Sequence, residues 1–243
     1  MSITIEKIIG ALRNVIDPNT EKDLISSHSA RNIRLEGSDV LFDVELDYLS
    51  KSQSKLIRDT ASVEVSKLNG VSRVIPNVYS KIKPHAVQRG IKVLSNIKNI
   101  IAIASGKGGV GKSTTAANLA LALVSEGARV GILDADIYGP SQPLIMGISG
   151  RRPETKDGKT MEPLESHGVQ ISSIGFMVKS DEPTVWRGPI VTKALQQLLF
   201  QTNWRNLDYL IIDMPPGTGD IQLTLSQKFP VTGAIIVTTP QDV

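Results

Sequence analysis

Residues 104–115 read ASGKGGVGKSTT and contain the spacing G-x-x-x-x-G-K-S, which is typical of a loop that binds nucleotide phosphates. The glycines of such a loop leave backbone N–H groups free to surround phosphate oxygens, and the helix that follows adds the partial positive charge of its N-terminus. Lys112 is expected to reach the β- and γ-phosphates, and the Ser113 hydroxyl to bind magnesium. The predicted nucleotide-binding residues are Gly106, Lys107, Gly108, Gly109, Val110, Gly111, Lys112, Ser113 and Thr114.

Two acidic positions complete the predicted site. Asp213 lies in the apolar run YLIIDM, and Asp134 and Asp136 lie in LDADIYGP, at the end of another such run. Ligands of open α/β sheets bind outside the carboxyl ends of the strands, so these carboxylates should lie near the phosphate loop. Asp213 could hold a magnesium-bound water; the alternative is a strand-terminal aspartate that only caps a helix.

The elements that must position these residues are predicted by short apolar runs that alternate with segments of helical character from residue 99 onward. Continuous apolar strands are what a parallel sheet covered on both faces requires. The phosphate loop stands between the first run and the helical segment STTAANLALALVSEG. Residues 99–243 are therefore expected to form an α/β domain with a doubly wound, mainly parallel sheet. The runs are NIIAIAS, ARVGILDA, VQISSIG, YLIIDM and GAIIVTT.

Residues 1–80 have the pattern of a separate small α+β domain. Apolar residues from Ile5 to Val15 follow helical spacing, and Asp17-Pro18 should end that helix. Residues 30–46 predict two strands around a turn, and Pro76 places a last strand at a sheet edge. A second helix between them should turn inward Leu56, Ile57, Ala61, Val65 and Leu68.

Residues 81–98 carry basic residues and no acidic ones, and we interpret them as a basic linker with a solvated face. The whole chain has 243 residues, a net charge of +3 and no cysteine. It shows no apolar stretch of about 18 residues and no cationic leader, so we expect a cytoplasmic protein that binds neither membrane nor nucleic acid. The histidines lack metal-ligand spacing, and both tryptophans should fill a core or an interface. These residues are His28, His85, His167, Trp186 and Trp204.

Three segments together resemble the deviant Walker A ATPases, and most specifically the Mrp/ApbC family of iron-sulfur cluster carriers: GKGGVGKS with its early lysine, DADIYGPSQP and DMPPGTGDIQL. The segment WRGPIVTKALQQLL strengthens the match, and residues 1–80 resemble the small MIP18-like domain that precedes the ATPase in many bacterial members. The resemblance implies a P-loop ATPase that uses ATP and Mg²⁺ in the assembly of iron-sulfur clusters and their transfer to client apoproteins.

The resemblance also implies roles for single residues. Lys107 would reach across a homodimer, formed through the phosphate-loop face, to neutralise charge on the nucleotide of the other subunit; the alternative is a solvated loop cation. Asp136 would orient the attacking water, with Asp134 as the less favoured position. Gly217 and Thr218 would form the switch that senses the γ-phosphate. The predicted catalytic residues are Lys107, Lys112 and Asp136.

The sequence departs from the family pattern in two places. The loop LDYLSKSQSKLI has no cysteine, and GAIIVTTPQDV stands where relatives continue with further elements and a Cys-x-x-Cys pair, so we expect no iron-sulfur ligand in these residues. A sheet ending there should expose an edge, and we expect poor solubility or reliance on a partner. Two other functions stay open: a ParA/MinD-like positioning ATPase, and a non-enzymatic adaptor that acts through its N-terminal domain.

Overall fold

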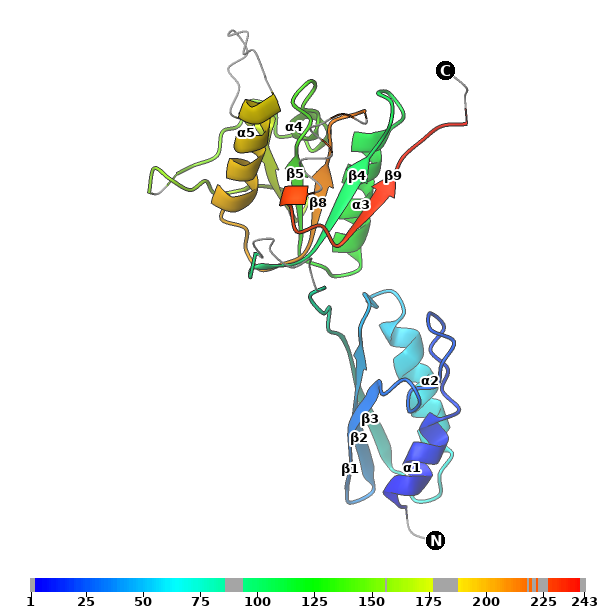
Figure 1. Ribbon diagram of the computed structural model, residues 1–243. Coiled ribbons are helices and arrows are strands. Elements are labelled where there is room, and N and C mark those ends of the chain that lie inside the picture. Colours follow the sequence, from blue (N-terminus) through cyan, green and yellow to red (C-terminus); the bar gives the residue numbers. More distant parts are fainter. Residues whose placement is uncertain are drawn as a thin grey trace. The chain divides into compact units, whose positions relative to one another are not determined.

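The computed structural model describes residues 3–85, 94–155, 157–176, 188–217, 219, 222 and 227–240. Its contacts divide the chain into two compact units, Met1–Lys83 and Pro84–Val243 (Figure 1). Each unit has its own sheet and its own buried core. Trp186 and Thr218 lie outside the described residues.

The first unit packs two helices on one side of a three-stranded sheet, in the blue to cyan part of Figure 1. The sheet order is β1-β2-β3, with β1 antiparallel and β3 parallel to β2. Pro76 therefore lies in an edge strand, as the sequence predicts. The elements are α1 (Ile5–Leu12), β1 (Ala30–Glu36), β2 (Asp39–Leu46), α2 (Ser54–Ser66) and β3 (Arg73–Ser80).

The inward face of this unit follows the predicted periodicities with one error. Alternate residues of β2 are buried under the helices, and Ile57, Ala61 and Val65 of α2 are buried at intervals of four residues. Leu56 is 57% exposed, so the prediction that it faces inward is wrong. One residue of an α-helix turns the side chain by about 100°, which carries Leu56 off the stripe that contains Ile57.

The second unit is an α/β domain whose six-stranded sheet has the order β6-β7-β5-β8-β4-β9. All neighbouring strands are parallel except the β6–β7 pair, which confirms the predicted fold class. The elements are β4 (Ile97–Ala104), α3 (Lys112–Ser125), β5 (Val130–Asp134), α4 (Gln142–Ile145), β6 (Leu164–Ser166), β7 (Val169–Ser173), the 3-10 helix η1 (Ile174–Phe176), α5 (Gly188–Gln201), β8 (Leu207–Asp213) and β9 (Gly233–Ile236).

Helices cover both faces of this sheet. Leu133 of β5 and Ile212 of β8 form one buried cluster with apolar residues of α5. The alternating residues Ile132 and Ile211 are also buried but point to the other face, where α3 contacts β4, β5 and β8. Because these three strands are parallel and adjacent, their carboxyl ends lie together at one edge, where the chemistry-bearing residues are expected.

The positions of Trp204, β4 and β9 can be compared with the sequence analysis. Trp204 is buried as predicted, and its indole N–H donates to the Leu199 carbonyl at 3.0 Å. β4 begins at Ile97, inside the segment interpreted as a linker, because the chain already pairs there with Leu207 of β8; Lys98 also forms an ion pair with Asp208 of that strand at 2.7 Å. At the other edge, all four residues of β9 are exposed.

Candidate nucleotide-binding site

The glycine-rich loop connects the carboxyl end of β4 to the first residue of α3. Gly109 and Gly111 have φ values of +79° and +89°, a left-handed conformation that favours glycine. Gly111 is the N-cap of α3, and no side chain caps the helix there. The first N–H groups of α3 thus lack a side-chain acceptor, and an anion can bind them.

Lys112 lies where the loop meets the acidic strand ends. Its side chain is buried, and Nζ contacts Asp213 Oδ1 at 2.5 Å and Asp136 Oδ2 at 3.5 Å. Nζ also lies 3.3 Å from the hydroxyl of Ser113. Residues from three separate segments, the loop, the end of β5 and the end of β8, therefore meet at one ammonium group.

Asp134 and Asp213 are register partners in the β5–β8 pair, and both are fully buried. Burial, with the neighbouring Asp213 charge adding to it, raises the pKa of Asp134 to about 7. Asp134 accepts hydrogen bonds from the backbone N–H groups of Gln142 and Asp136 at 3.0 and 3.2 Å and from the Ser173 hydroxyl at 3.1 Å. It holds the turn after β5 in place.

Asp136 is placed differently from Asp134. It is 8% exposed, its Oδ2 faces Lys112, and its Oδ1 accepts from the backbone N–H groups of Tyr138 and Gly139 at 3.2 and 3.3 Å. Asp136 thus lies at the surface of the acidic cluster, while Asp134 lies beneath it. This distinction was open in the sequence.

Gln142 is a site residue that sequence reasoning missed. Its side-chain amide nitrogen donates to Asp213 Oδ2 at 2.8 Å and to the Ser113 carbonyl at 2.9 Å. It lies in the segment DADIYGPSQP, but a neutral amide eight residues after Asp134 carries no signal of its own. The pairing with Asp213 spans 71 positions of the sequence.

Two other predicted residues lie on the loop side of the site. Gly217 has a φ of +106°, and its N–H donates to the Ser105 carbonyl, just before the loop, at 2.9 Å. Lys107 is exposed, and within the described part of the chain its side chain makes no ion pair or hydrogen bond. The structure therefore does not bring Lys107 into the cluster around Lys112.

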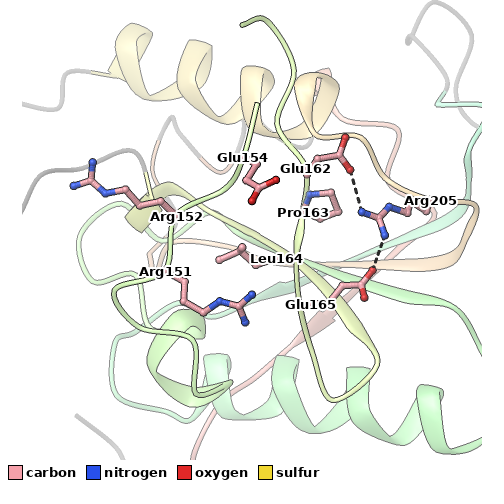
Figure 2. A pocket seen from close by; sticks show the side chains of 8 residues that line it. All are labelled: Arg151, Arg152, Glu154, Glu162, Pro163, Leu164, Glu165 and Arg205. Carbon is pink, nitrogen blue, oxygen red and sulfur yellow. Dashed lines mark hydrogen bonds and ion pairs between the residues drawn. The ribbon is translucent and has the colours of Figure 1, made fainter. Parts of the chain in front are cut away.

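A separate surface pocket of about 560 Å³ lies beside β6 (Figure 2). Arg205 pairs there with Glu162 and Glu165, each at 3.0 Å, as the dashed lines in Figure 2 show. None of the predicted site residues lines this pocket. The pocket is lined by Arg151, Arg152, Glu154, Glu162, Pro163, Leu164, Glu165 and Arg205.

The donor groups near Lys112 suit magnesium. Mg²⁺ prefers hard oxygen ligands, keeps several waters and uses few protein groups together with substrate phosphates. The Ser113 hydroxyl and the Asp213 carboxylate are oxygen donors of this kind, and Asp213 keeps acceptor capacity beyond its two hydrogen bonds. Within the described residues, no group of three or more His, Cys, Asp and Glu side chains could form an all-protein metal site.

A glycine-rich loop between a parallel strand and a helix, with a buried lysine and aspartates at the neighbouring strand ends, defines a P-loop NTPase. Residues 96–243 match the family model described as NUBPL iron-transfer P-loop NTPase, and residues 5–75 match that of an iron-sulfur cluster assembly protein. The chain belongs to this family of iron-transfer P-loop NTPases, which confirms the resemblance seen in the sequence.

Curated relatives agree with this assignment. The iron-sulfur cluster carrier protein of Escherichia coli K12 is 45% identical over 97% of this chain and 64% of its own length. That of Pseudomonas fragi is 62% identical over 73% of this chain and 62% of its own length. The chain thus spans less than two thirds of the length of these relatives.

A solved structure supports the fold of the second unit. A nucleotide-binding protein from Archaeoglobus fulgidus, in complex with ADP, aligns with a TM-score of 0.54 and 40% identity over 62% of this chain and 58% of its own. In the described part of the chain, no helix is both long and apolar enough to cross a membrane.

Proposed function

We propose that this chain binds ATP with Mg²⁺ and hydrolyses it, and that turnover serves the assembly of iron-sulfur clusters and their transfer to apoproteins. One observation carries the hydrolytic part: Lys112, at the end of the glycine-rich loop, is held by Asp213 and Asp136 from two neighbouring strand ends. An ammonium placed there can exchange carboxylate partners for phosphate oxygens when a nucleotide fills the loop.

The residues of the site have separate roles in this proposal. Backbone N–H groups of residues 106–114 surround the phosphates, and Lys112 contacts the β- and γ-phosphates. Ser113 binds Mg²⁺ directly and Asp213 binds it through water, and the ion supplies charge neutralisation on the phosphates. Asp136 orients the attacking water, because it lies at the surface of the cluster and faces Lys112.

We further propose that two copies of the chain associate through the phosphate-loop face. Lys107 then contacts the nucleotide of the partner copy and neutralises charge that develops in the transition state. Its exposure on this loop supports that role, since the side chain is not held by the cluster around Lys112. Gly217, tied to Ser105, forms with Thr218 the switch that senses the γ-phosphate.

The link to iron-sulfur clusters rests on the names of the relatives and on the family model of the first unit. The cluster is cargo in this proposal. Clusters are held by cysteine thiolates, and these 243 residues contain none, so the chain contributes the nucleotide-dependent step and the first unit contacts client apoproteins. A cytoplasmic location remains a prediction.

A Lys112→Ala variant tests the proposal, with Lys193→Ala as the control, because Lys193 is exposed on α5. We expect ATP hydrolysis, measured as phosphate release, to fall by a factor of about 100 or more in Lys112→Ala and to stay unchanged in the control. Equal turnover in the two variants contradicts the proposed catalytic role. An unmodified chain that binds no labelled ATP analogue points to the adaptor alternative, and ATP-dependent binding to anionic vesicles or DNA points to a positioning ATPase.

A further inference from the structure

Gln142 occupies a place in the nucleotide site that the phosphate-loop spacing does not predict. Its side chain is fully buried, and its amide nitrogen joins the Asp213 carboxylate to the carbonyl of Ser113. We propose that Gln142 is a positioning residue: it fixes Asp213 against the first turn of α3 and offers its amide oxygen to a water molecule of the hydrated magnesium ion. The magnesium part of this proposal rests on the proposed function.

The orientation of the amide follows from its partners. A carboxylate oxygen and a backbone carbonyl oxygen only accept hydrogen bonds, so the NH₂ group of Gln142 must face Asp213 and Ser113. Both amide hydrogens are therefore used, and Oε1 must point elsewhere. Gln142 Oε1 is buried, and among the described residues it has no hydrogen-bond partner. A buried acceptor in this state favours a donor from a ligand or a bound water.

The position of this oxygen indicates which donor it takes. Covalent geometry keeps Oε1 about 2.3 Å from Nε2, so Oε1 lies at most about 5 Å from the Asp213 oxygen that Nε2 contacts. The side-chain amide of Gln142 contacts Asp213 and the backbone carbonyl of Ser113, and these are the two residues proposed to hold magnesium. Magnesium at nucleotide sites keeps several of its waters, and each such water is a hydrogen-bond donor. Neighbouring acceptors that orient the ligands of a metal ion tune its affinity.

A purely structural role for Gln142 makes a different prediction. A brace that only fixes Asp213 is lost in both Gln142→Leu and Gln142→Glu, because neither side chain can donate to the Asp213 carboxylate, so it predicts a change of magnesium-dependent affinity in the same direction in both variants. An acceptor for a magnesium-bound water affects only the gain in affinity that magnesium confers. The ratio of the dissociation constants of labelled ADP in EDTA and in Mg²⁺ therefore separates the two roles by the direction in which each variant moves it.

The experiment compares the unmodified chain with Gln142→Leu, Gln142→Glu and the control Leu144→Ala. Leu144 belongs to the same helix and is 75% exposed. In Gln142→Leu we expect the ratio to fall about tenfold, because an uncharged side chain cannot accept from the metal-bound water. In Gln142→Glu we expect the ratio to rise, because a carboxylate is a stronger acceptor. Leu144→Ala should keep the ratio of the unmodified chain.

Three results decide the proposal. The magnesium part is overturned if the ratio is the same in all four proteins or moves in the same direction in both Gln142 variants. In that case, magnesium-dependent binding of ADP by the unmodified chain still supports the proposed function. Failure of the unmodified chain to bind ADP overturns the proposed function and the magnesium part together. The positioning part, in which Gln142 fixes Asp213 against α3, is tested separately and without nucleotide, by hydrogen exchange at the backbone amides of residues 116–120. We expect faster exchange in Gln142→Leu than in Leu144→Ala, and equal exchange overturns it.

Discussion

The ion pair between Lys112 and Asp213 makes a quantitative prediction about stability. Both side chains are buried, and Nζ and Oδ1 are 2.5 Å apart. Removing one partner of a buried pair leaves an uncompensated charge, which costs about 3–5 kcal/mol of folding free energy. We therefore expect Lys112→Met to lose about that much. Asp213→Asn should lose less, because Lys112 keeps Asp136 as a second carboxylate 3.5 Å away.

The double variant Lys112→Met with Asp213→Asn removes both charges and should recover part of the loss, giving a coupling energy of about 2 kcal/mol. Urea unfolding followed by tryptophan fluorescence measures the four proteins. Both tryptophans, Trp186 and Trp204, belong to the second unit, so the signal reports that unit alone. Single losses that add up in the double variant to within about 0.5 kcal/mol refute the argument, because the two charges would then not depend on each other.

Two further predictions concern the same unit and the same assay. Asp134 has a pKa of about 7 in the folded chain, against an ordinary value of 3.8, so its contribution to stability falls as the pH rises from about 4 to 7. The loss of stability between pH 5 and pH 8 should therefore be smaller in Asp134→Asn than in the unmodified chain. Equal losses in the two proteins contradict this. A Cβ at Gly131 would lie 2.6 Å from Leu207 Cδ1 and 3.0 Å from Trp204 Cζ3, so Gly131→Ala should cost about 1–3 kcal/mol of folding free energy. Gly139→Ala should change stability little, because a Cβ there meets open space. Similar losses in the two variants contradict the steric argument.

Elements that form apolar runs or apolar stripes could be predicted from the sequence, and an element that exists only through pairing could not. The strands β5, β7 and β9 lie within the predicted apolar runs, and β4 and β8 each begin two residues before theirs. β6 has three residues, Leu164–Ser166, of which only Leu164 is apolar, and it exists because it pairs with β7. Lys98 reads as part of a basic run until its partner Asp208, 110 positions away, is seen on the next strand.

The same distinction applies to the site. The spacing of the loop identifies Lys112 and Ser113, because every glycine and the lysine stand in one short segment. The position of Asp213 at the end of β8 and that of Asp136 just beyond the end of β5 could also be predicted, since the carboxyl ends of parallel strands have a defined place in the sheet. The roles of Asp134 and Gln142 depend on hydrogen bonds that cross from one strand end to another. Such contacts leave no periodic trace in a sequence.

The segment that follows β8 shows how events at the phosphates could reach the rest of the unit. Asp213, the last residue of β8, is held by Lys112 and Gln142, and Gly217, four residues later, is held by the Ser105 carbonyl. Between them, the N–H of Met214 donates to the Ile103 carbonyl at 3.0 Å, which continues the β8–β4 pairing beyond the strand. The segment is thus tied to the phosphate loop at both ends. A change of partner at Lys112 must alter the forces on Asp213, and Gly217 lies only four residues further along the same tied segment. This arrangement supports the proposal that Gly217 belongs to the switch, because one short segment connects it to a carboxylate that contacts Lys112.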